Sequence, residues 1–133
     1  MSPLFNKLNL GTHRLIHVLN APASFEPELK ALDGVTVRRS VTGEVGFALA
    51  FVITQAQLDS ASVQLVIAAV GDALLWMVYP KGTSRRYTCE FNRDSGWRVL
   101  RDAEFESVRM VAIDEDWSAL RFRRSEHVKP RRR

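Results

Sequence analysis

The sequence is poor in the residues from which common catalytic and metal centres are built. Cys89 is the only cysteine among 133 residues, which excludes an internal disulfide and favours a reducing compartment. The sequence has three histidines, His13, His17 and His127. Their spacing, with Cys89 as the one cysteine, does not match that of a metal-binding motif. The pattern Gly-x-Ser-x-Gly of nucleophile-elbow hydrolases is absent. We therefore predict no metal ligand and assign no catalytic residue from the sequence.

Long hydrophobic runs are also missing. No apolar run reaches the ~18 residues that a membrane-spanning helix needs. The first eight residues, Met-Ser-Pro-Leu-Phe-Asn-Lys-Leu, lack the basic-then-apolar order of a secretory signal. With 46% hydrophobic and 26% charged residues, the composition is typical of a soluble globular protein. We expect a cytoplasmic protein that does not bind membranes, with one domain of ordinary size.

Excess positive charge is confined to one end of the chain. Residues 121–133 carry seven basic side chains and one acid, whereas residues 1–120 carry 12 basic and 14 acidic side chains. We predict a single α/β domain at residues 1–124, followed by a basic, disordered tail at 125–133. A contact with nucleic acid through Arg121, Arg123, Arg124 and the terminal arginines stays open. The tail has no aromatic residue to stack on bases, which weakens that alternative.

Strand-like and helix-like segments alternate along the chain. Strands are predicted at residues 15–19, 35–39, 47–53, 74–78, 108–113 and 119–124, and helices at 24–32, 54–70 and 94–105. The two most apolar strands, 47–53 and 74–78, are expected to be covered on both faces, and strand 35–39 to lie at an edge. This alternation implies parallel strands joined by right-handed crossovers. We predict a three-layer α/β sandwich with a Rossmann-like, mostly parallel sheet of about six strands and a C-terminal antiparallel hairpin.

The order of segments from Phe47 to Arg124 resembles the second half of a class I methyltransferase domain. The resemblance implies the strand order 2-1-3-4-6-5, with the last strand antiparallel. It also implies a glycine-rich cofactor loop after the first strand and a ribose-binding acid at the end of the second. These positions read Leu19-Asn-Ala-Pro-Ala-Ser24 and Arg38-Arg-Ser40. The resemblance thus favours the fold and disfavours S-adenosylmethionine, and the cofactor is left unknown.

Three strings in the sequence support a second resemblance that covers nearly the whole chain. Val18–Pro22, Tyr79–Ser84 and Ile113–Phe122 are similar to a family of small bacterial proteins whose function is not assigned. This resemblance implies a bacterial, cytosolic protein and supplies no activity.

The predicted ligand site lies where neighbouring strands end. Open α/β sheets bind ligands at the carboxyl ends of their strands, and an apolar strand here runs straight into a polar loop. Backbone amides around Gly82, together with the side chain of Lys81, are suited to an anion. The same loop is also explained as an ordinary β-turn. The residues that we predict to converge on a small ligand are Asn20, Thr54, Lys81, Gly82, Thr83 and Ser84.

Three functions are compatible with these observations. We expect a non-catalytic binding or interaction module, with a protein partner or a second copy of the chain, because this function requires no motif that the chain lacks. A small enzyme, or a nucleotide- or anion-binding protein that uses the loop 79–84, is the first alternative. A nucleic-acid-associated protein is the second. The cluster Asp114-Glu115-Asp116 is interpreted as a turn, Cys89 as an inert thiol, and Trp117 as a cover for the core.

Overall fold

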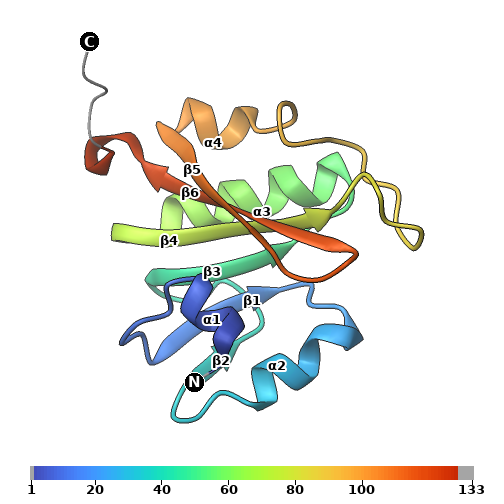
Figure 1. Ribbon diagram of the computed structural model, residues 1–133. Coiled ribbons are helices and arrows are strands. Elements are labelled where there is room, and N and C mark those ends of the chain that lie inside the picture. The colour runs from blue at the N-terminus through green and yellow to red at the C-terminus, as the bar shows by residue number, and fades with distance from the viewer. Residues whose placement is uncertain (1, 129–133) are drawn as a thin grey trace.

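The computed structural model describes residues 2–128 and contains one mixed sheet of six strands (Figure 1). The strands are β1 (Leu15–Leu19), β2 (Thr36–Arg38), β3 (Val45–Phe51), β4 (Ala69–Pro80), β5 (Phe105–Ala112) and β6 (Trp117–Arg124). Their order across the sheet is β2-β1-β3-β4-β6-β5. The first four strands are parallel, and β6 is antiparallel to both of its neighbours. The α/β class, the strand order and the antiparallel hairpin are therefore confirmed.

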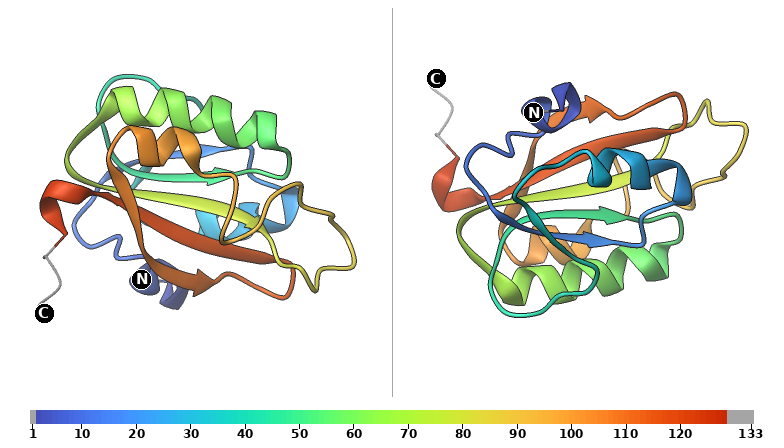
Figure 2. Two further views of the ribbon diagram at one scale, coloured as in Figure 1. Left: turned by 90° about the horizontal axis from the view of Figure 1, so that it is seen from above. Right: turned by 90° about the horizontal axis from the view of Figure 1, so that it is seen from below.

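Helices cover both faces of this sheet (Figure 2). One face carries α1 (Pro3–Lys7) and α2 (Glu26–Lys30), and the other carries α3 (Gln55–Ala68) and α4 (Arg98–Asp102). Successive side chains of a strand point to opposite faces, so β3 contributes to two hydrophobic clusters. Phe47, Leu49 and Phe51 pack on the side of α1 and α2, whereas Ala48 and Ala50 pack on the side of α3. The three layers follow from this double burial of the central strands.

The helix boundaries differ from the predicted ones at three places. The backbone of Ala69 is already extended, with φ −65° and ψ 130°, so α3 ends at Ala68, before the predicted end at residue 70, and residues 69–71 belong to β4. The helix predicted at residues 24–32 is α2, which begins at Glu26. Residues 23–25 form a 3-10 turn before it, and Ser24 makes no capping hydrogen bond. α4 is short because Glu104 adopts a left-handed conformation, with φ 64°, and Phe105 starts β5.

The helix α1 was not predicted, because five residues are too few to display a helical period. It is nevertheless tied firmly to the sheet. Phe5 and Leu8 are fully buried, and the indole Nε1 of Trp76 donates to the backbone oxygen of Leu8 at 3.0 Å. Trp117 is also buried, at 3% exposure, which confirms its predicted place over the core.

The end of the described chain packs back onto the sheet. Ser125–His127 form a 3-10 turn, and the guanidinium of Arg124 donates to the backbone oxygen of Ala69 at 2.8 Å. The same guanidinium lies 4.8 Å from the centroid of the Phe105 ring. Residues 129–133, which make up the rest of the predicted tail, lie outside the described residues. Within the described range, no helix is long and apolar enough to cross a membrane.

Candidate functional site

The carboxyl ends of β1, β3 and β4 form one edge of the sheet. The side-chain amide of Asn20 donates to the backbone oxygen of Phe51 at 3.2 Å, and the backbone nitrogen of Val52 donates to the oxygen of Val78 at 2.8 Å. Asn20, Thr54 and the loop that begins at Lys81 therefore follow adjacent strand ends, as the sequence predicts. They do not line one common cavity, however, because Asn20 and Lys81 border two separate hollows.

Thr54 is occupied by the start of α3. Its hydroxyl oxygen accepts a hydrogen bond from the backbone nitrogen of Gln57 at 3.1 Å, and the side-chain oxygen of Gln57 accepts from the backbone nitrogen of Thr54 at 3.1 Å. This reciprocal pair is a capping box, which satisfies backbone donors that the helix itself leaves unpaired. Thr54 thus caps the helix predicted at residues 54–70, and the capping role accounts for this threonine without a ligand.

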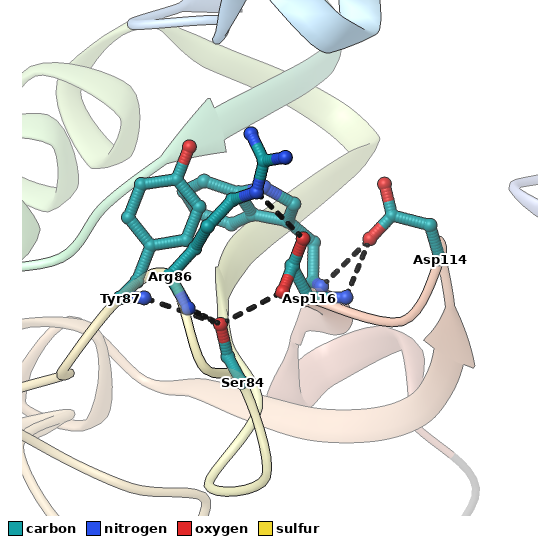
Figure 3. Close-up of polar contacts among 6 residues, drawn as sticks. Ser84, Arg86, Tyr87, Asp114 and Asp116 are labelled. Atoms are coloured by element: carbon teal, nitrogen blue, oxygen red, sulfur yellow. Dashed lines mark hydrogen bonds and ion pairs between the residues drawn. The ribbon is translucent and has the colours of Figure 1, made fainter.

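Ser84 organises the loop after β4 (Figure 3). Its hydroxyl donates to the Oδ1 atom of Asp116 at 2.9 Å and accepts from the backbone nitrogens of Arg86 and Tyr87, each at 3.2 Å. The backbone nitrogen of Lys81 also donates to the backbone oxygen of Asp116, at 2.8 Å. The loop is thus fastened to the turn between β5 and β6, and the Ser84 hydroxyl serves that purpose.

The acidic cluster is a turn, as interpreted from the sequence. The Oδ1 atom of Asp114 accepts from the backbone nitrogens of Asp116 and Trp117 at 2.8 and 2.9 Å (Figure 3). The Oδ2 atom of Asp116 lies 3.8 Å from the Nε atom of Arg86. These carboxylates therefore have partners within the turn and the adjoining loop.

Residues 79–95 line one of the two hollows, which we name the loop cavity. Its volume is about 450 Å³, and it is lined by Lys81, Gly82 and Ser84 of the predicted site together with Tyr79, Tyr87, Cys89, Phe91 and Arg93. Tyr79 belongs to the loop 79–84 considered from the sequence, whereas the lining by Cys89, Phe91 and Arg93 was missed, because long-range contacts fold this segment. One of the residues that shape it is Gly96, which has φ 99° and at which a Cβ atom would lie 2.8 Å from the Cβ of Phe91.

Hydrogen bonds to α3 hold the far side of the loop cavity. The backbone nitrogen of Glu90 donates to the backbone oxygen of Ile53 at 3.0 Å, and the carboxylate of Glu90 accepts from the backbone nitrogen of Gln55 at 2.9 Å. The side-chain amide of Gln55 then donates to the backbone oxygen of Gly96 at 2.8 Å. The segment is anchored at both ends, so the cavity is a defined part of the fold.

Two titratable groups in the loop cavity remain protonated at neutral pH. Burial raises the pKa of the Tyr79 phenol and the pKa of the Cys89 thiol. Protonated groups donate hydrogen bonds and are weak nucleophiles, since the thiolate is the reactive form of cysteine. The interpretation of Cys89 as an unreactive thiol therefore agrees with its surroundings.

The second hollow, which we name the strand-end cavity, opens between the ends of β1 and β2 and one side of α3. Its volume is about 450 Å³, and its polar lining comes from Asn20, Arg39, Ser40, Gln57, Ser60 and Gln64. Asn20 adopts the left-handed conformation, with φ 58°, directly after β1. Asparagine is among the few residues other than glycine that adopt this conformation readily.

An ion pair connects the residue that follows β2 to the first residue of α2. The guanidinium of Arg39 donates to both carboxylate oxygens of Glu26, at 2.7 and 2.8 Å. The hydrogen bond from Arg39 holds the pKa of the Glu26 carboxyl below its usual value. A carboxylate therefore reaches the end of β2, but it comes from the helix that follows β1. Sequence reasoning considered only the residues of the strand end itself and missed it.

Two of the arginines considered for nucleic-acid binding have partners within the fold. Arg123 pairs with Asp72, and Arg124 is held by the Ala69 oxygen and the Phe105 ring. Arg121 is half-buried in β6, and its Nε atom has no hydrogen-bond partner within residues 2–128.

Comparison with known proteins identifies the fold. The chain is similar to a SAM-dependent methyltransferase of Aquifex aeolicus, with a TM-score of 0.59 and 11% identity over 90% of this chain and 86% of the other. It is also similar to the magnesium protoporphyrin IX methyltransferase of Synechocystis PCC 6803, with a TM-score of 0.57 and 12% identity over 92% and 78% of the two chains. The mitomycin 7-O-methyltransferase MmcR matches with a TM-score of 0.63 and 9% identity, and the chain spans half of its length. No protein-family model and no curated protein matches the sequence.

These similarities correct one expectation. A non-catalytic binding or interaction module was expected, but the Synechocystis and Aquifex structures, which match nearly the whole chain, are methyltransferases. The comparison contradicts that expectation. The predicted methyltransferase-like fold is confirmed. At 9–12% identity the similarity establishes the fold, and the activity has to be argued from the site.

Proposed function

We propose that this protein is a small methyltransferase-fold enzyme that binds S-adenosylmethionine in the strand-end cavity. The observation that carries the proposal is the place of this cavity, at the carboxyl end of β1 and beside β2. The connection after β1 leads to β2 on one side, whereas the connection after the neighbouring β3 leads to β4 on the other side. Open α/β sheets bind ligands at such a switch point. The volume of about 450 Å³ is within the range of small-molecule sites. The structure of the Synechocystis enzyme was determined with bound SAH, the product form of this cofactor.

The residues present fit this cofactor without a glycine-rich loop. Asn20 supplies the left-handed turn after β1 that glycine would otherwise make. Ser40, Ser60 and Gln64 offer hydroxyl and amide groups to the ribose and the adenine. S-adenosylmethionine, when bound, supplies a methyl group on a positively charged sulfur.

The ion pair between Arg39 and Glu26 has two consequences for this site. Its carboxylate lies at the end of β2, where the resemblance to methyltransferases implies a ribose-binding acid. Its guanidinium holds the loop after β2 against α2, which fixes one wall of the cavity before a ligand arrives. Such positioning reduces the conformational entropy that binding would otherwise cost.

The proposal retains the expectation of a bacterial, cytoplasmic protein, which rests on the three similar strings of the sequence.

Calorimetric titration with S-adenosylmethionine and S-adenosylhomocysteine tests this function. We expect the wild-type protein to bind both compounds and Ser60→Trp to lose at least tenfold in affinity, because an indole would fill the cavity from the exposed side of α3. Val63→Trp is the matched control, since Val63 is exposed on the same helix and does not line this cavity. Absence of binding by the wild-type protein at millimolar ligand would overturn the proposal. Equal losses in the two variants would place the ligand elsewhere.

A further inference from the structure

The loop cavity differs from the strand-end cavity in its charge and in its residues. The two cavities share no lining residue. The charged residues of the loop cavity are Lys81, Arg93 and Glu90, and the Glu90 carboxylate already accepts the backbone nitrogen of Gln55. The neighbouring acid Asp116 is likewise occupied, by Ser84 and Arg86. The cavity is therefore bordered by two cations and by no carboxylate without a partner among residues 2–128.

Lys81 is the better placed of the two cations. It is half-buried and makes no ion pair with any described residue, whereas Arg93 is exposed and lies 3.6 Å from Asp94. Its ammonium group is therefore a cation of the cavity lining that has no counter-ion among residues 2–128. The backbone nitrogen of Lys81 is fixed on Asp116, so its side chain extends from an anchored position.

Aromatic side chains form the remaining wall. Tyr79 is 5% exposed and Phe91 is 6% exposed, and their ring centroids lie 5.8 Å apart. Tyr87 lines the cavity from the opposite part of the loop and packs on Trp117, with ring centroids 4.8 Å apart. Aromatic surface of this kind favours a flat, apolar body in a ligand. The phenol of Tyr79 and the hydroxyl of Thr88 add polar groups.

We propose that the loop cavity binds a small organic acid with a planar, apolar body, whose oxyanion pairs with Lys81 and Arg93 and whose body packs against Tyr79 and Phe91. A carboxylate and a phosphate ester share this oxyanion chemistry. The inference does not depend on the proposed cofactor, because the two cavities are separate and binding here requires no methyl transfer.

Titration of the full chain with benzoate, phenyl phosphate and the neutral analogue benzamide, followed by ¹H–¹⁵N correlation NMR, tests this site. We expect both acids to shift the amide signals of Gly82, Thr88 and Asn92, which lie around the cavity, and benzamide to bind at least tenfold more weakly. The stronger of the two acids then identifies the oxyanion. Failure of both acids to shift these signals at 10 mM would overturn the proposal, whatever the result with S-adenosylmethionine.

A matched pair of variants distinguishes specific binding in the loop cavity from general attraction of the anion to positive charge. Lys81→Met keeps an unbranched side chain that is one atom shorter and carries no charge. We expect it to weaken binding about tenfold or more, as the loss of a charged hydrogen bond does. Arg85→Gln removes an exposed cation from the same loop that does not line the cavity, and its affinity should stay within about twofold of wild type. Equal weakening in the two variants, or shifts centred on Asn20 and Ser60, would contradict the assignment.

Discussion

Arg123 and Asp72 join the beginning of β4 to β6 through two parallel hydrogen bonds. The Nε atom of Arg123 donates to Oδ1 of Asp72 at 2.8 Å, and its Nη2 atom donates to Oδ2 at 2.6 Å. The two residues are 51 positions apart in the sequence, so the pair closes a long connection. It also gives a charged residue of an interior strand a partner at the surface.

This pair makes the stability of the protein depend on pH at the acidic end. The hydrogen bond from Arg123 lowers the pKa of the Asp72 carboxyl from its ordinary value of 3.8. The contribution to stability is therefore complete above pH ~4 and is lost as pH falls through the lowered folded-state pKa. We expect Asp72→Asn to lower the free energy of unfolding slightly at pH 7 and to show a smaller difference near pH 2. Urea unfolding at the two pH values measures this, and an equal deficit at both would contradict the linkage.

The anchoring of α1 by Trp76 predicts a larger effect. Trp76→Phe removes the hydrogen bond to the Leu8 oxygen and leaves space in a fully buried position. We expect a loss of about 2 kcal/mol or more in the free energy of unfolding, from the unpaired carbonyl and the reduced packing. Val63→Ala, at an exposed position of α3, should change stability by less than about 0.5 kcal/mol. Denaturant unfolding followed by circular dichroism compares the two.

The capping box of α3 gives a prediction with a conservative control. Thr54→Ala removes the acceptor for the backbone nitrogen of Gln57, so we expect a loss of about 1 kcal/mol. Thr54→Ser keeps the hydroxyl and should stay close to wild type. If Thr54 contributed only to ligand binding, both variants would unfold like the wild-type protein. Thermal unfolding without ligand therefore separates the capping role from a binding role.

The strand order was predictable because it depends on the sequence of elements along the chain. Apolar segments such as 47–53 can only be buried between helices, and right-handed crossovers then leave few arrangements. The resemblance of the segments from Phe47 onward to a methyltransferase domain selected one of these arrangements, with the last strand inserted beside β4. The short helix α1 carried no such signal, since its position depends on a tertiary contact with Trp76.

The candidate site was predictable only as an edge of the sheet. Asn20, Thr54 and Lys81 do lie at adjacent strand ends, because the carboxyl ends of parallel strands share one edge. The sequence did not distinguish hydroxyls that cap and turn the chain from hydroxyls that are free for a ligand, and Thr54 and Ser84 have the former role. The walls of the loop cavity depend on contacts such as that between Gln55 and Gly96, which join residues 41 positions apart. Local patterns carry no information on contacts of this range.

Substitution of Gly96 is expected to affect both the stability of the protein and ligand binding in the loop cavity. A Cβ atom at this position would lie 2.8 Å from the Cβ of Phe91 and 2.9 Å from the side-chain oxygen of Gln55, and the backbone has φ 99°. Gly96→Ala must therefore displace Phe91 or break the contact with Gln55, at a cost of roughly 1–3 kcal/mol. Because Phe91 lines the loop cavity, we also expect benzoate binding to weaken.

Gly43→Ala is the matched control for this effect. Gly43 also has a left-handed backbone, with φ 67°, but nothing lies within 4 Å of the added Cβ. It should therefore lose only the conformational term of about 1 kcal/mol and leave benzoate binding unchanged. Urea unfolding and the benzoate titration, performed on both variants, separate backbone strain from steric displacement. The two variants could instead lose equal stability and bind benzoate as the wild-type protein does. That result would mean that the loop adapts around the new methyl group at residue 96 without moving Phe91.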